Sequence, residues 1–214
     1  MANGTLSLPS TASITTAVTS TLSGLVGGVG VLGDGLFTAP GPTFRARLTI
    51  DPDTRAPGVT RVLRPNAPIS AVIRFGSAQT RGSVVRTACI KLPDYHGPNR
   101  DQDFLLASSA DGIPFHHAVL PAATPGEPIY SSLWLYLSGL APVVFGLRAV
   151  QLANDDEVAR GDRFSFLAAG AVTRFMPAGT LDIGDQMDDE TVEFAARNSG
   201  GGLRPLPPAL FYRS

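Results

Sequence analysis

The histidines and arginines of this sequence are the residues whose types and neighbours could do chemistry. His116 and His117 are adjacent, and a histidine can take up or release a proton near neutral pH. Arg74 and Arg86 each lie inside an apolar run, where a permanently charged guanidinium needs an anion. That anion is either a carboxylate of the same protein or a carboxylate or phosphate of a ligand.

The adjacent histidines are not predicted to share a metal ion. In an extended segment consecutive side chains point to opposite faces, so at most one of the pair faces a cavity. The alternative is that each is a structural histidine with a hydrogen-bonded ring. The sequence has no P-loop, dinucleotide fingerprint, zinc-finger spacing or nucleophile elbow, and no nucleophile–base pair is recognisable in it.

Strand-like segments position the two arginines. Arg74 lies in 69–75 and Arg86 in 84–92, and a third such segment covers 103–107. All three are rich in β-branched or bulky apolar residues and are bounded by Gly, Pro, Asn or Ser, which predicts strands. Further strands are predicted over 44–51, 163–169, 171–176 and 180–183. The spacing of apolar residues predicts helices over 129–140, 143–152 and 191–197.

The composition favours a single globular domain and argues against a nucleic-acid partner. The chain has 214 residues, of which 43% are hydrophobic and 16% charged, and its formal net charge is −1. This charge gives no electrostatic basis for binding nucleic acid. Cys89 is the one cysteine, so an intramolecular disulfide is excluded and a reducing, cytoplasmic location is predicted.

The first 43 residues are predicted to form an apolar arm or helix, distinct from a body that spans 44–214. No charged side chain occurs before Asp34, and residues 12–32 are apolar and small but dense in Ser, Thr and Gly. Integral membrane insertion is not expected, because it favours about 20 strongly apolar residues. We expect the arm to cover the core or to join subunits into a homo-oligomer, with contact to a membrane surface as the alternative.

The segments around the arginines resemble the core of the haem catalase superfamily. In that family a V-R-F-S/T strand is followed by D-V-R-G-x-A-V-K, then by D-L-V-x-N-N and T-P-x-F-F. This sequence has, in the same order, V-I-R-F-G-S at 72–77, V-R-T-A-C-I-K at 85–91, D-F-L-L-A-S at 103–108 and I-P-F-H-H at 113–117. It is more similar still to short catalase-like proteins of actinobacteria, and the resemblance runs from Phe44 to the C-terminus.

The resemblance implies a mainly β (α+β) fold, an antiparallel catalase-like β-barrel with flanking helices and a helical C-terminal tail. It also implies haem as the cofactor, with Tyr212 as the iron ligand and Arg74 as the partner of a haem propionate. Phe75 and Arg86, which lie in the same matching segments, are the other implied cofactor contacts. One of the adjacent histidines would be the distal catalytic group.

Departures from the family pattern argue against efficient catalase activity. No histidine precedes His96, although the family's distal acid/base comes from the chain before the first barrel strand. The distal asparagine falls on Ala107 or Ser108, and the arginine that stabilises the tyrosinate falls on Pro208. Peroxide cleavage needs a group that transfers a proton and a polar donor beside it.

Two functions remain open from the sequence. The first is a haem protein with peroxidase-like or other oxidative activity on peroxide or a small organic substrate. The second is a haem-free barrel that binds a small apolar or anionic ligand, or that acts as a structural or assembly subunit. The distal histidine and the proximal arginine are the features that distinguish them.

Overall fold

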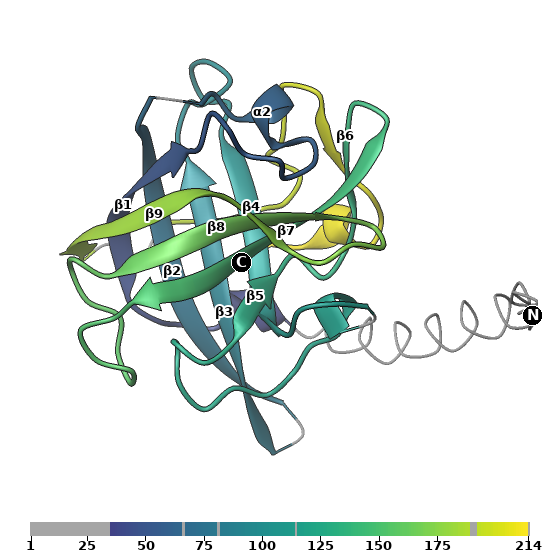
Figure 1. Cartoon of the computed structure of the whole chain (residues 1–214). Coiled ribbons are helices and arrows are strands. Elements are labelled where there is room, and N and C mark those ends of the chain that lie inside the picture. Colours follow the sequence, from purple (N-terminus) through teal and green to yellow (C-terminus); the bar gives the residue numbers. More distant parts are fainter. Residues whose placement is uncertain (1–34, 66, 81, 114, 189–191, 214) are drawn as a thin grey trace, which may run out of the picture.

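A closed antiparallel β-barrel forms the body of the chain (Figure 1). The computed structural model describes residues 35–65, 67–80, 82–113, 115–188 and 192–213. The barrel strands are β1 (Thr43–Ile50), β2 (Ile69–Thr80), β3 (Ser83–Leu92), β4 (Gln102–Ser109), β5 (Ile129–Ser131), β7 (Ala141–Gln151), β8 (Arg163–Gly170) and β9 (Met176–Met187). They pair in the order β1-β2-β3-β4-β5-β7-β8-β9, and β9 pairs with β1 to close the barrel. The predicted mainly β fold, an antiparallel barrel, is confirmed.

Helices are short in the part of the chain that the structure describes. They are η1 (Leu36–Thr38), α2 (Val59–Val62), η2 (Phe115–His117) and η3 (Ala209–Phe211). The predicted helical C-terminal tail is therefore reduced to the single turn η3, and residues 192–197 form no helix. No helix within the described ranges is long and apolar enough to cross a membrane. Most of the predicted N-terminal arm, up to Asp34, lies outside the described residues.

The two longer helices predicted after residue 128 are wrong. Residues 129–140 hold β5 and β6 (Tyr136–Ser138), and residues 143–152 belong to β7. Leu133, between β5 and β6, has a φ of 59°, a value that no right-handed helix allows. The apolar spacing of these segments serves strands instead, because β5, β6 and β8 all pair with β7 and this pairing overrides local helical preference.

The predicted strand at 171–176 is wrong as well. Residues 171–175 form the turn between β8 and β9, and the second of these strands begins only at Met176. Gly170 N donates to the Thr173 hydroxyl at 2.9 Å, which is typical of a tight turn. The predicted strands at 44–51, 69–75, 84–92, 103–107 and 163–169 match observed strands, and 180–183 lies within β9.

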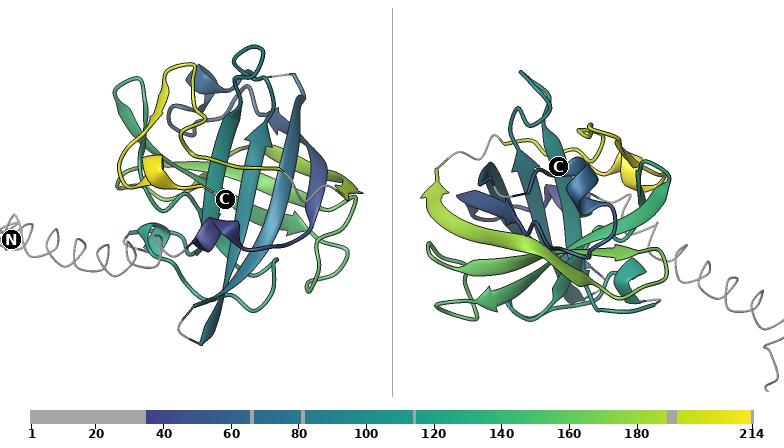
Figure 2. Two further views of the ribbon diagram at one scale, coloured as in Figure 1. Left: turned by 180° about the vertical axis from the view of Figure 1, so that it is seen from behind. Right: turned by 45° about the horizontal axis from the view of Figure 1, so that its top comes forward.

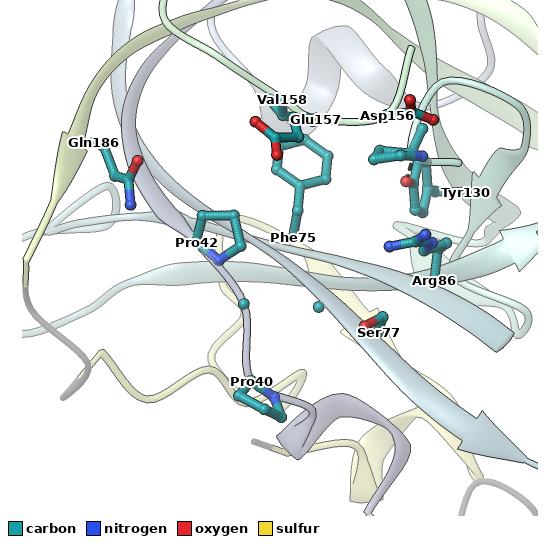
Figure 3. A pocket seen from close by; sticks show the side chains of 13 residues that line it. Pro40, Pro42, Phe75, Ser77, Arg86, Tyr130, Asp156, Glu157, Val158 and Gln186 are labelled. Atoms are coloured by element: carbon teal, nitrogen blue, oxygen red, sulfur yellow. Dashed lines mark hydrogen bonds between the residues drawn. The ribbon is translucent and has the colours of Figure 1, made fainter. Parts of the chain in front are cut away.

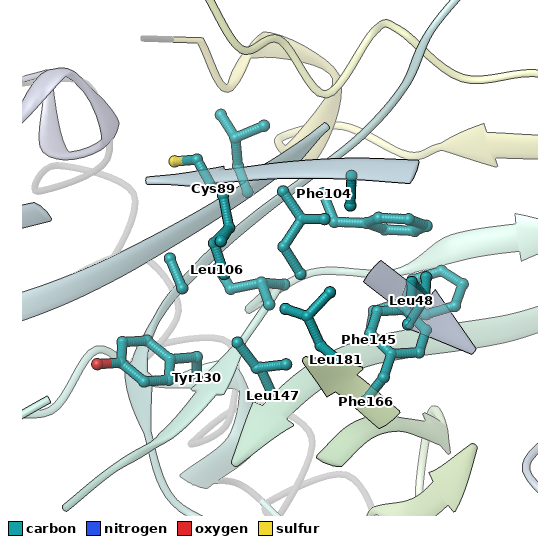
Figure 4. Packing of buried hydrophobic residues seen from close by; sticks show 14 of the residues in the cluster. Leu48, Cys89, Phe104, Leu106, Tyr130, Phe145, Leu147, Phe166 and Leu181 are labelled. Atoms are coloured by element: carbon teal, nitrogen blue, oxygen red, sulfur yellow. The ribbon is translucent and has the colours of Figure 1, made fainter. Parts of the chain in front are cut away.

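Aromatic rings fill the inside of the barrel (Figure 4). Strand residues alternate between the inside and the outside, and Phe104, Phe145 and Phe166 point inward from β4, β7 and β8. Their ring centroids are 4.8 to 5.8 Å apart, within the range of favourable aromatic contacts. Burial of these side chains supplies the main driving force for closing the barrel.

The C-terminal segment, residues 192–213, covers the outside of the barrel and is fixed there by Asp103 of β4. Figure 2 (left) shows this segment crossing the outer face of the sheet. The Asp103 carboxylate is 0% exposed and accepts hydrogen bonds from Ala195 N at 2.8 Å and Asn198 Nδ2 at 2.9 Å. It also pairs with Lys91 of β3 at 3.1 Å. One buried carboxylate thus joins two barrel strands to the C-terminal segment.

Replacing this carboxylate should release the C-terminal segment. Asp103→Ala leaves Ala195 N and Asn198 Nδ2 without their acceptor in a buried place, so we expect the free energy of unfolding to fall by about 3 kcal/mol. Urea denaturation measures the loss. Asp101→Ala is the control, because Asp101 also pairs with Lys91 but is partly exposed, and it should cost less than about 1 kcal/mol. Equal losses in the two variants would contradict this account.

Candidate functional site

Phe75 and Arg86, two of the predicted cofactor contacts, come together at one open end of the barrel (Figure 3). Phe75 and Ser77 point inward from β2, and Arg86 of β3 pairs in register with Ser77. Together they line a cavity of about 300 Å³. Its other lining residues come from the chain before β1, from β2, β5 and β9, and from the loops before β5 and β8: Pro40, Gly41, Pro42, Gly76, Pro125, Tyr130, Asp156, Glu157, Val158 and Gln186. We call this cavity the barrel mouth.

Arg86 brings a positive charge into the barrel mouth that is only partly satisfied by protein atoms. One terminal nitrogen, Nη2, donates to the carbonyl of Ala123. The Nε atom is buried and has no hydrogen-bond partner among the described residues. A guanidinium carries five N–H donors, and a buried donor without a partner is costly. Because Arg86 also lines the cavity, its guanidinium is suited to receive an acceptor from a ligand.

The wall of the barrel mouth beside Arg86 is held in place by Tyr130. Its hydroxyl donates to the carbonyl of Pro125 at 2.8 Å, and Ala123 N donates to the Glu127 carboxylate at 2.8 Å. Burial raises the pKa of Tyr130 well above its ordinary value, although the nearby Arg86 charge acts in the opposite direction. Tyr130 is therefore a neutral donor with a fixed partner, which leaves it no role as a base.

Part of the rim of the barrel mouth is acidic. Asp156 and Glu157 lie in the loop between β7 and β8, and both side chains are exposed. The buried carboxylate of Asp162 accepts hydrogen bonds from Ala153 N and Ala159 N, each at 2.8 Å, and so fixes both ends of this loop. In the described part of the chain, neither rim carboxylate forms an ion pair within 4.0 Å.

Arg74 and Tyr212 lie outside the barrel, Arg74 beneath the C-terminal segment and Tyr212 within it. Arg74 directly precedes Phe75 on β2, and so the two side chains point to opposite faces. The Arg74 guanidinium donates to the Phe37 carbonyl at 2.9 Å and to the Val192 carbonyl at 3.4 Å, and it lies 4.9 Å from the centre of the Phe194 ring. Among the described residues no carboxylate forms an ion pair with this arginine, although the sequence predicted an anion there. Two backbone carbonyls and an aromatic face stabilise its charge instead.

Tyr212, the predicted iron ligand, packs against η1. Its ring centroid is 5.0 Å from that of Phe37 and the residue is 4% exposed. Its hydroxyl is buried and has no hydrogen-bond partner in the described ranges, and burial raises the pKa of the phenol. The Cys89 thiol is also buried, which raises its pKa to about 12 and leaves it unreactive.

The adjacent histidines form a hydrogen-bonded pair at a third place. They lie on η2, where a helical turn brings their rings together, so the expectation of opposite faces is wrong. The Nε2 atoms of His116 and His117 are 2.8 Å apart, and His117 Nδ1 is 2.9 Å from the Leu133 carbonyl. His117 therefore donates from Nδ1 and accepts at Nε2, and His116 donates to it from Nε2. This is the structural alternative considered for the pair.

The described residues contain no group of three or more His, Cys, Asp or Glu side chains that could hold a metal ion. The predicted site residues thus fall into three groups, at the barrel mouth, beneath the C-terminal segment and on η2. Sequence reasoning found Arg86 and Phe75 but missed Tyr130 and the acidic rim. The acidic run before β8 was a signal for the rim, but only barrel closure brings that run opposite β3.

The histidine pair predicts a loss of stability in mild acid. Burial, reinforced by the neighbouring His117, lowers the pKa of His116 to about 4, whereas an unfolded histidine titrates near 6.5. The unfolded chain therefore binds the extra proton between these values, and stability falls as the pH falls through this window. We expect roughly 2 kcal/mol to be lost between pH 7.5 and 4.5. Urea denaturation should show a shallower pH dependence in His116→Gln, and an unchanged slope would contradict the assignment.

Comparisons with known proteins support the fold but do not establish a function. No family model and no curated protein sequence matches this chain. Among solved structures it is similar to the crystal structure of a fungal catalase, with a TM-score of 0.55 and 10% sequence identity. The match covers 81% of this chain and 57% of the catalase chain, so this chain corresponds to little more than half of that enzyme. At such low identity the likeness establishes a catalase-like barrel and leaves the chemistry to be argued from the site.

Proposed function

We propose that this chain is a haem-free, catalase-like barrel that binds a small ligand with an anionic group in the barrel mouth. The observation that carries the proposal is the Arg86 guanidinium, which lines a cavity of about 300 Å³ and has one hydrogen bond, to the Ala123 carbonyl, among the described residues. A carboxylate is the acceptor that best matches the planar fork of an arginine. The ligand's anionic group would complete the hydrogen bonding of Arg86.

The remaining walls of the barrel mouth favour an apolar body on that ligand. Phe75 and Val158 are buried side chains that line the cavity, and Pro40, Pro42 and Pro125 add apolar surface. The volume lies at the small end of the range for ligand pockets, which is about 300 to 1,000 Å³. A short aliphatic or single-ring acid would suit it.

Haem does not fit the residues that the resemblance assigns to it. Arg74 already donates to two backbone carbonyls, so it is not free for a propionate. Tyr212 is a buried phenol with a raised pKa, and the binding of ferric iron would need the tyrosinate. The histidine pair is committed to hydrogen bonds on η2. These chemical states argue against a haem-dependent function for this chain.

Calorimetric titration of hexanoate into the purified full chain tests the proposal. We expect hexanoate to bind and Arg86→Gln to weaken its binding by about 10- to 100-fold, because a hydrogen-bonded charge pair is lost. Arg148→Gln is the matched control, since Arg148 is an exposed strand arginine of β7 that does not line the cavity. Hexanamide has the same shape without the charge and should bind weakly. Equal binding of hexanoate to wild type and Arg86→Gln would refute the proposal.

Hemin addition tests the absence of a haem site. We expect the full chain mixed with hemin to emerge from gel filtration without a Soret band, because Tyr212 stays protonated in its buried place. Tyr212→Phe is run in parallel and should give the same spectrum. A Soret band that stays with the wild-type chain and is lost in Tyr212→Phe would restore the haem-binding hypothesis.

A further inference from the structure

Charges of opposite sign face the same cavity at the barrel mouth without touching. Arg86 lies on β3 at the inner wall, while Asp156 and Glu157 lie on the rim loop between β7 and β8 (Figure 3). No ion pair within 4.0 Å joins these groups among the described residues. Elsewhere in the same molecule facing charges do close onto each other, as Arg163 does onto Asp182 at 2.7 Å. The separation between Arg86 and the two carboxylates at the barrel mouth, which we call the gap, therefore requires a structural explanation.

Both sides of the gap are held apart by the fold. Arg86 is fixed at one end by its strand and at the other by its hydrogen bond to the Ala123 carbonyl. The rim loop is fixed by the Asp162 carboxylate, which binds the backbone on both sides of Asp156 and Glu157. The Arg86 guanidinium and the backbone of the rim loop cannot move together without breaking these hydrogen bonds. The space between the charges is thus a lasting feature, available to a molecule that spans it.

We infer that the ligand of the barrel mouth is a small zwitterion, with a carboxylate at Arg86 and an ammonium group at Asp156 and Glu157. The inference rests on the proposed function and specifies which class of anion the site takes. A simple anion would be attracted by Arg86 but repelled by the two rim carboxylates, whereas a zwitterion is attracted at both ends. An apolar spacer between its two charges would lie along Phe75 and Val158.

Titrations with matched ligands test the inference. The probes are 4-aminobutanoate, 6-aminohexanoate and 8-aminooctanoate, each compared with the parent acid that lacks the amine. Exposed ion pairs contribute modestly, so we expect the best amino acid of the series to bind about three- to tenfold more tightly than its parent acid. Three chain lengths are used so that a mismatch in span does not hide the preference.

Rim variants separate the ammonium contact from the Arg86 contact. In the double variant Asp156→Asn/Glu157→Gln, the preference for the amino acid should disappear and the parent acid should bind more tightly than it does to wild type. Asp155→Asn is the control, because Asp155 is an exposed neighbour that does not line the cavity. It should leave the preference unchanged. Circular dichroism confirms that each variant is folded.

The outcomes distinguish this inference from the proposed function. If wild type binds every parent acid at least as tightly as its amino acid, the inference is overturned while binding of anions through Arg86 stands. If the rim variant keeps the preference, the ammonium group is held elsewhere and the inference is again overturned. If neither acids nor amino acids bind, the proposed function fails and the inference fails with it.

Discussion

In the closed barrel, the side chain of each strand residue points either into the barrel or away from it. This constraint separates neighbours in the sequence that belong to one motif. Arg74 and Phe75 are consecutive, yet the arginine lies beneath the C-terminal segment while the phenylalanine lies in the barrel. The same rule brings Arg86, from the next strand, to the side of Phe75. The candidate site exists because closure joins β2 and β3 to the loop before β8, far away along the chain.

The outer face of the barrel solves a different problem, the burial of charged groups. Lys91 and Asp103 face outward from β3 and β4, where the C-terminal segment covers them. Their mutual charge, the backbone N–H of Ala195 and the side-chain amide of Asn198 compensate the cost of removing the carboxylate from water. Arg74 is compensated in the same region by carbonyl groups and an aromatic ring. On the face that would have to hold a haem under the family resemblance, these three charged groups are thus already compensated by protein atoms.

Sequence reasoning succeeded where local pattern and long-range pairing agree. The first barrel strands carry β-branched residues between clear turn signals, and β2, β3 and β4 occur where they were predicted. It failed at β5 and β7, whose apolar spacing imitates a helix, because pairing to neighbours that are distant in sequence decides their conformation. It failed at the histidine pair for a related reason, since a single helical turn reverses the facing of adjacent side chains. The sequence could not show that the acidic loop before β8 lines the same cavity as Arg86, because the two are distant along the chain.

The buried Asp162 carboxylate has a consequence for the thermodynamics of recognition. By holding both ends of the rim loop, it orders that loop before any ligand arrives. The loss of conformational entropy on ordering the loop occurs during folding, so it does not lower the affinity for the ligand. Differences in affinity between ligands at the barrel mouth would then depend directly on their charge and shape. This is lock-and-key binding, in contrast to a loop that folds around its ligand.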